Sequence, residues 1–241
     1  MDHAKLLIIV LNLISKDLPS TKIVAKKDCW YHRVIGWFLS KTTPDYMERY
    51  WTTFSGTIAH PGDELEAHDW GILLHEQLHL RQERKWTLLL FQALYLLGTP
   101  VYAGAAVLLA LLLLPLWILV APWWISLIIV GVGCVLSSPV PFGRFRAHWE
   151  LQAYELDVAV SYWMRGSIDD SFITYCESVF TSANYFFMLP HKEETQSKFK
   201  KVRKRVIFGG IFSSGPYAKF YRRLYRELKA AGATKSVYNT I

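Results

Sequence analysis

The feature that most constrains this chain is a run of 58 residues, Trp86 to Gly143, without a single Asp, Glu, Lys or Arg. A transmembrane helix needs about 20 apolar residues, so the run is too long for one span and long enough for two. Glycine and proline at Gly98-Thr99-Pro100 and Ala121-Pro122 mark the expected breaks. The sequence therefore predicts a hydrophobic membrane hairpin over residues 86–143, with a large buried soluble core as the alternative.

Just before this run, His75-Glu76-Gln77-Leu78-His79 has the pattern H-E-x-x-H. Residues four apart lie on one face of a helix, so both imidazoles can reach one metal ion, and Glu76 points into the same cleft. A helix is expected because Asp69 can cap its start and apolar residues form a broad face. The pattern predicts one Zn²⁺ per chain on His75 and His79. A packed, hydrogen-bonded histidine pair without metal is the alternative.

A catalytic zinc usually has three protein ligands, so the third must come from another segment. We expect Glu150, in the helix-like residues 144–157 that follow the run. Asp157 lies two turns further on, where it can orient a zinc-bound imidazole by a hydrogen bond. His148 and Glu155 are competing ligands, and a solvated Glu150 is the non-functional alternative.

One ion can bind ligands before and after the run only if the run crosses the bilayer an even number of times. Basic residues flank both of its ends: Arg81, Arg84 and Lys85 before it, Arg144 and Arg146 after it. The positive-inside rule then predicts an integral membrane protein with its active site on the cytoplasmic side. Near the N-terminus, the nine apolar residues Leu6–Ile14 are short for a span and predict an interfacial or packing helix.

The motif His75–His79, the hydrophobic stretch and the later Glu150–Ala153 together resemble the gluzincin metallopeptidases. They are closest in layout to the membrane-bound group that includes HtpX and the CAAX prenyl protease. The resemblance implies a zincin-like peptidase domain in which Glu76 is the general base for a zinc-activated water. That group has Glu-x-x-Ala-Asp downstream, whereas this chain has Tyr154 in place of the aspartate. The matching residues cover two short segments, 69–85 and 144–157.

Tyr50–Ala59 is rich in β-branched and aromatic residues and predicts one strand before the metal helix. The resemblance implies an edge strand that binds an extended peptide, and an ordinary hairpin strand is the alternative. Residues 159–190 look helical, with a break between Gly166 and Asp170. Tyr154 or Tyr185 is a candidate donor to a developing oxyanion, with core packing as the alternative.

Residues 191–241 contain 13 Lys or Arg and 3 Asp or Glu, a net charge of +10, whereas the whole chain carries +7. This basic region is expected to bind anionic lipid headgroups, or else the phosphates of nucleic acid. A solvated tail is the alternative.

These observations predict a mainly α fold with a small β element. The expected parts are residues 1–85 and 144–190 for the peptidase domain, 86–143 for the hairpin and 191–241 for the basic region. The expected function is zinc-dependent hydrolysis of peptide or protein substrates by a membrane-anchored enzyme. An intramembrane site-2-type protease is a weaker variant, because no Asn-Pro-Asp-Gly-like ligand segment follows. The alternative from another class is a non-enzymatic membrane protein with a lipid- or nucleic-acid-binding tail and a structural or vestigial metal site.

Overall fold

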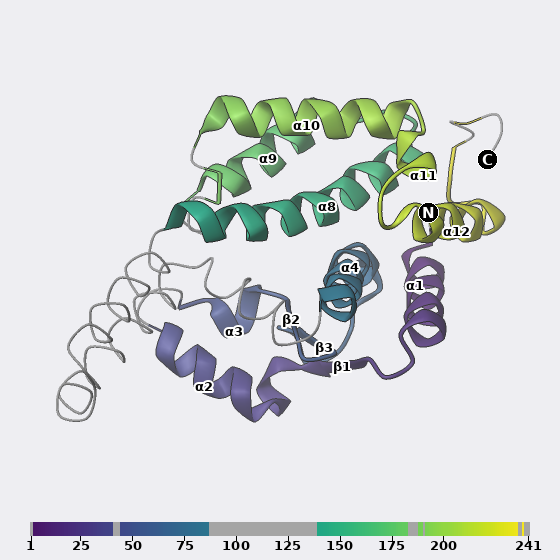
Figure 1. Cartoon of the computed structure of the whole chain (residues 1–241). Coiled ribbons are helices and arrows are strands. Elements are labelled where there is room, and N and C mark those ends of the chain that lie inside the picture. The colour runs from purple at the N-terminus through teal and green to yellow at the C-terminus, as the bar shows by residue number, and fades with distance from the viewer. Residues whose placement is uncertain are drawn as a thin grey trace. The chain divides into compact units, whose positions relative to one another are not determined.

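The computed structural model describes residues 2–40, 44–86, 139–182, 188–189, 191–235 and 238. This part of the chain is mainly helical with one small sheet, as the sequence predicts (Figure 1). The expected membrane hairpin lies outside the described residues except at its two ends. Among the helices that are described, none has the length and apolar character needed to cross a bilayer.

Within the described residues the helices are α1 (His3–Asp17), α2 (Trp30–Leu39), α3 (Tyr46–Arg49), α4 (Trp70–Trp86), α8 (Pro139–Arg165), α9 (Asp170–Thr181), α10 (Lys192–Ile207), α11 (Gly210–Ser213) and α12 (Ala218–Ala230). Two short 3-10 helices are η1 (Lys26–Asp28) and η2 (Ala67–Asp69).

The chain forms two compact units. The first comprises Met1–Trp86, Gln152–Asp169 and Lys200–Ile241, and the second comprises Thr87–Leu151 and Asp170–Phe199. The four-part organisation expected from the sequence stays a prediction.

The sheet of the first unit contains β1 (Lys22–Ala25), β2 (Thr52–Phe54) and β3 (Thr57–His60) in the order β1-β3-β2. β1 pairs with β3 in parallel and β2 pairs with β3 antiparallel. The expectation of one strand over Tyr50–Ala59 is wrong, because Ser55 and Gly56 have φ angles of 50° and 73° and form a tight turn. Two successive residues with positive φ are typical of the two-residue hairpin turn whose twist matches that of the flanking strands. The segment is therefore a two-stranded hairpin with β2 at the edge.

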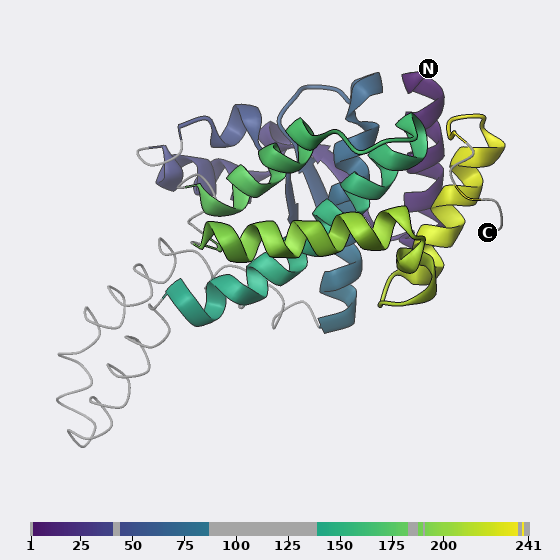
Figure 2. The ribbon, with the colours of Figure 1, turned by 90° about the horizontal axis from the view of Figure 1, so that it is seen from above.

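Helix α4 packs against both β2 and β3 (Figures 1 and 2). The backbone N–H of Gly56 in the hairpin turn donates to Glu83 Oε1 of α4 at 3.0 Å. At the start of α4, the chain first forms η2, where Asp69 accepts a bond from the backbone N–H of Glu66 at 2.8 Å. Asp69 thus belongs to a capping box around η2. The packing of α4 on both strands and the bond from the Gly56 N–H to the Glu83 carboxylate together fix the hairpin beside α4.

Helix α1 is a packing helix, one of the two forms that the sequence predicts. Its buried residues recur at helical spacing and form one apolar stripe, Leu6, Val10, Leu13 and Ile14. The stripe faces α4 and α12. A second core cluster joins α8 to the C-terminal segment, where Trp163 stacks on Phe212 with ring centroids 5.5 Å apart and Tyr225 meets Trp163 edge-on.

The predicted break after α8 is confirmed, because α8 ends at Arg165, Gly166 adopts a φ of 78° and α9 begins at Asp170. In the second unit, Phe180 of α9 meets Phe199 of α10 edge-on at a centroid distance of 5.3 Å. Both rings are fully buried and form part of that unit's core.

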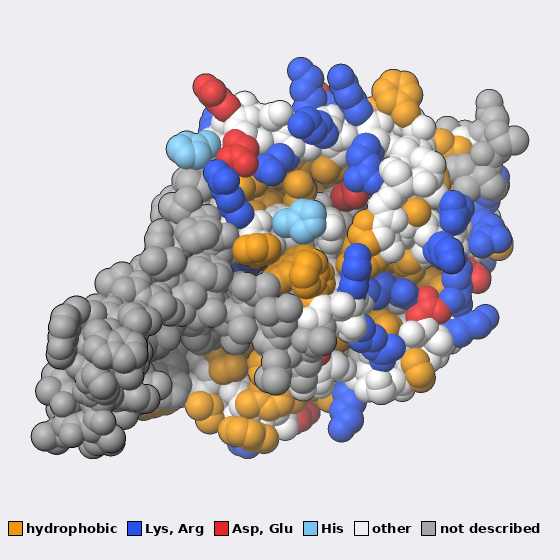
Figure 3. Space-filling view, in the orientation of Figure 1, with side chains coloured by type: hydrophobic (Ala, Val, Ile, Leu, Met, Phe, Trp, Pro, Cys, Tyr) orange, Lys and Arg blue, Asp and Glu red, His pale blue; other side chains and the backbone are white. Residues whose placement is uncertain are grey.

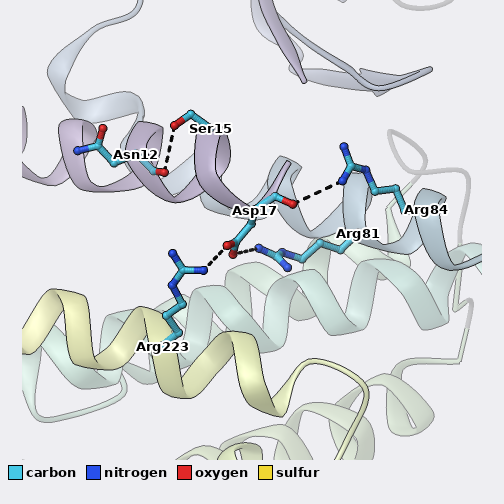
Figure 4. A network of polar contacts seen from close by, with 6 residues as sticks. All are labelled: Asn12, Ser15, Asp17, Arg81, Arg84 and Arg223. Atoms are coloured by element: carbon cyan, nitrogen blue, oxygen red, sulfur yellow. Dashed lines mark hydrogen bonds and ion pairs between the residues drawn. The ribbon is translucent and has the colours of Figure 1, made fainter. Parts of the chain in front are cut away.

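An arginine cluster around Asp17 holds α1, α4 and α12 together (Figure 4). Arg81 of α4 donates to Asp17 Oδ2 at 2.5 Å, and Arg223 of α12 donates to Asp17 Oδ1. Arg84 donates to the Asp17 carbonyl oxygen at 3.5 Å and to Ser20 at 2.8 Å. An acidic residue at a helix C-terminus is unfavourable by itself, and the arginines offset that charge.

We predict that Asp17→Ala lowers the free energy of unfolding by about 1.5–3 kcal/mol, because two partly buried arginines lose their charged acceptor. Urea unfolding in mild detergent measures the change. The control is Asp63→Ala, which removes an exposed ion pair between Lys27 and Asp63. The control is expected to leave the unfolding midpoint unchanged, since exposed pairs contribute little. Equal losses in the two variants would contradict the structural role of Asp17.

Candidate metal centre

Helix α4 presents His75, Glu76 and His79 within two turns. The rings of His75 and His79 are neighbours, with centroids 5.0 Å apart and an interplanar angle of 69°. His79 and Glu76 are buried, whereas His75 keeps 14% of its side chain exposed. A helix repeat of 3.6 residues makes this juxtaposition a direct consequence of the four-residue spacing.

Helix α8 supplies the third side chain. His75, His79 and Glu150 each offer one ligand atom, and these three atoms lie within 4.8 Å of one another. Glu150 is on the same unbroken helix as Gln152 and Asp157. The two histidines and the glutamate that the sequence selects are therefore brought together by two helices.

A hydrogen bond from α8 holds the first histidine. His75 Nδ1 lies 2.8 Å from Asp157 Oδ2, which is the contact expected for Asp157. Metal-binding histidines commonly engage their second ring nitrogen in such a bond, which fixes the tautomer and the ring orientation. With Nδ1 bonded to a carboxylate, Nε2 is the ring nitrogen of His75 that suits a metal ion.

A chain of two amides holds the second histidine, a contact that is not part of the sequence-based prediction. His79 Nδ1 lies 2.8 Å from Gln82 Oε1, and Gln82 Nε2 donates to Gln152 Oε1 at 3.1 Å. An amide oxygen only accepts, so Nδ1–H of His79 is the donor in this contact, an arrangement that favours metal binding through Nε2. The spacing of Gln82, three residues after His79 on the same helix face, was the available signal.

The donor set fits zinc, because two imidazole nitrogens and one carboxylate oxygen form the His₂Glu set of catalytic zinc sites. Glu150 is only 3% exposed, and a buried carboxylate requires a cationic or hydrogen-bonding partner. Arg146, one turn earlier on α8, places its Nε 3.9 Å from Glu150 Oε1. The same carboxylate is therefore also one half of an ion pair, a role that needs no metal.

The carboxylate of Glu76 is held from the edge strand. The hydroxyl of Thr53, in the middle of β2, donates to Glu76 Oε2 at 2.6 Å. This distance is typical of a strong, charge-assisted O–H···O⁻ bond. Thr53 lies in the segment expected to border the metal helix, but no sequence signal assigned it to Glu76. Strand β2 thus orients the residue next to the candidate metal ligands.

A buried cluster of ionisable groups lies within electrostatic reach of Glu76. Lys26 is fully buried, donates to the carbonyl oxygen of Tyr46 at 2.8 Å and stacks over the Tyr46 ring. Burial lowers the pKa of Lys26 to about 7, and the negative charge of Glu76 opposes this shift. His32 Nδ1 lies 2.8 Å from the Tyr46 hydroxyl, and burial followed by the charge of Lys26 lowers the His32 pKa to about 4. Residues 16–37 mix polar and apolar side chains without a recognisable motif, so the sequence did not indicate this cluster.

The competing ligands lie elsewhere. His148 is exposed on α8, and Glu155 pairs with Arg205 at 3.0 Å. Burial raises the pKa of Glu155, and Arg205 opposes that shift. The buried ring of Tyr154 meets the ring of His75 edge-on, with centroids 5.1 Å apart, so it packs against a candidate ligand. Tyr185 lies outside the described residues.

No protein-family model, curated protein or solved structure matches this chain. The resemblance to gluzincins therefore stays a prediction that rests on two short segments. Any function must be argued from the chemistry of the site itself.

The lowered pKa of Lys26 predicts a pH-dependent stability. Between pH 10.5, the ordinary pKa of a lysine, and about pH 7, the pKa of buried Lys26, the unfolded chain binds a proton at this residue that the folded chain does not, so the free energy of unfolding falls as the pH falls. Lys26→Met removes this uptake and is expected to flatten the profile and to stabilise the protein at pH 7. Urea midpoints at pH 7, 8 and 9 provide the measurement.

The matched control for this experiment is Lys27→Met, since Lys27 is the next residue and its side chain is 57% exposed. Its profile is expected to run parallel to that of the wild type. Parallel profiles for Lys26→Met and the wild type would show that Lys26 does not remain neutral in the folded protein at pH 8 and 9.

Proposed function

We propose that this chain is a membrane-anchored, zinc-dependent peptidase. The observation that carries the proposal is the convergence of one ligand atom each from His75, His79 and Glu150 within 4.8 Å. The hydrogen bonds on Nδ1 of both histidines support it, since they favour coordination through Nε2. Three protein ligands are the number that leaves an open position for catalysis.

In the proposed peptidase, bound zinc supplies Lewis acidity that polarises the scissile carbonyl and makes water a better nucleophile. Glu76 accepts the proton of the attacking water on its carboxylate and delivers it to the leaving amine. The Thr53 hydroxyl, bonded to Oε2, holds this carboxylate in one orientation. Asp157 keeps the His75 ring in place and makes its Nε2 a better electron donor to the metal.

Strand β2 is the proposed docking edge for the substrate. The sheet order β1-β3-β2 places it at one side, and no other described strand pairs with its outer edge. An extended peptide that adds to this edge would run beside the strand that carries Thr53. Strand addition provides affinity through the peptide backbone and suits a substrate of variable sequence.

The proposed anchor is the uncharged run Trp86–Gly143. Two candidate ligands precede this run and the third follows it. If all three bind one ion, the run returns to the side of the bilayer from which it left. Two crossings satisfy this condition and the length of the run. The basic residues at both ends favour a cytoplasmic active site.

Metal analysis tests the proposed ligands. The full chain, purified in mild detergent, is expected to contain about one zinc per chain by elemental mass spectrometry. His75→Ala and Glu150→Ala are expected to lose it, and Asp157→Asn to weaken zinc binding about 10- to 100-fold. His148→Ala, on an exposed position of the same helix, is the control and should retain zinc. A folded, metal-free wild type, or a Glu150→Ala variant that retains stoichiometric zinc, would exclude this ligand set.

Peptide cleavage tests the proposed chemistry. Against a mixed peptide library with mass-spectrometric detection, Glu76→Gln is expected to keep its zinc and to lose about 10²- to 10⁴-fold in rate. Thr53→Val is expected to lower kcat about tenfold or more with little change in KM, because a hydrogen bond to a charged group is lost. Thr53→Ser keeps the hydroxyl and should restore most of the rate. Zinc-loaded wild type without cleavage of any peptide would refute the peptidase assignment.

A further inference from the structure

The basic C-terminal region carries two kinds of cation. One kind is engaged inside the first unit, as shown by the pairs Arg223–Asp17 and Arg205–Glu155 and by the bond from Arg222 to the Phe212 carbonyl. The other kind lies in water. Lys200, Lys201 and Lys204 of α10 have exposed side chains, and together they form what we term the α10 basic face. Lys and Arg side chains also gather over α10 in Figure 3.

The α10 basic face has no acidic residue nearby in sequence. Residues 195–226 contain ten Lys or Arg and no Asp or Glu. Lys201 and Lys204 are three apart, and Lys200 and Lys204 are four apart, so the three ammonium groups share one helix surface. Their mutual repulsion is unfavourable unless an anionic partner neutralises it.

An exposed phenylalanine extends this face. Phe208 follows Lys204 by four residues and Lys201 by seven, which places it directly after the end of α10 on the same side. Its side chain is 81% exposed, more than any other large hydrophobic residue among those described. Gly209, with a φ of 69°, then turns the chain into α11. A bulky apolar ring beside three lysines is the combination that suits the headgroup boundary of a bilayer.

We propose that the α10 basic face and Phe208 form a docking surface for anionic lipid membranes. The lysines contact phosphate headgroups, and Phe208 inserts its ring among the upper acyl carbons. Each lysine near an anionic surface is expected to raise affinity roughly fivefold at physiological salt. Nucleic acid is the less favoured partner, because Phe208 offers one apolar ring rather than a series of stacking surfaces, and the same chain carries the apolar run Trp86–Gly143. This surface does not depend on the metal centre, so it stands whether or not the chain is a peptidase.

Lysine footprinting of the full chain tests the proposal. Protein purified in mild detergent is mixed with nanodiscs of neutral phosphatidylcholine or of phosphatidylcholine with 30% phosphatidylglycerol, about the anionic content that gives a strong surface potential. An uncharged acylating reagent and mass spectrometry then measure the reactivity of each lysine. Lys200, Lys201 and Lys204 are expected to react at least threefold more slowly in the anionic discs. The exposed Lys27 and Lys235 should react equally in both discs.

Variants and salt separate lipid docking from general attraction of charge. Phe208→Ser is expected to lose at least half of the protection, whereas Tyr175→Ser, a control at an exposed aromatic of α9, should keep it. Sodium chloride at 0.5 M should abolish protection, because it screens headgroup charge. Equal lysine reactivity in the two discs overturns the proposal. Protection by a polynucleotide in neutral discs, without protection by anionic lipid, overturns it in favour of nucleic acid.

Discussion

The bond between His75 Nδ1 and Asp157 Oδ2, 2.8 Å long, joins α4 to α8 at the point on which the candidate centre depends. An imidazole that lacks a partner on Nδ1 can change its tautomer and rotate, and its second nitrogen then has no defined direction. Asp157 removes that freedom. Glu150 lies on the same helix, two turns before Asp157.

Helix α4 buries an unusual number of polar side chains for a helix in a protein core: Glu76, Gln77, His79, Gln82 and Glu83. Burying such groups is unfavourable unless hydrogen bonds compensate for lost water. Glu76, Glu83 and Gln82 find partners on β2, in the hairpin turn and on α8, whereas both amide atoms of the Gln77 side chain are buried without a hydrogen bond to the described residues. Where a sequence departs from the ordinary apolar core pattern and surrounds the departure with hydrogen bonds, a functional site is the common reason.

The basic charge of the chain divides into a structural and an exposed part. Arg81 and Arg223 neutralise Asp17 at the end of α1 and thereby join three helices. The guanidinium of Arg81 also lies 4.1 Å from the centre of the Phe220 ring, so its charge and its stem both contribute to packing. The α10 basic face makes no comparable internal contact among the described residues. Net charge alone, +10 over residues 191–241, does not distinguish these two roles.

The sequence by itself determined the histidine pair, the helices that carry His75 and Glu150, the break at Gly166 and the packing stripe of α1, because these follow from local spacing and chain stiffness. It predicted a single strand over Tyr50–Ala59, which two positive φ angles convert into a hairpin. The sequence favoured Glu150 over His148 and Glu155, and the tertiary structure places Glu150 with the two histidines. Only the tertiary structure brought Thr53 to Glu76 and placed Lys26 near that carboxylate. Such contacts join residues distant in sequence, and they depend on how helices and strands pack rather than on any periodicity along the chain.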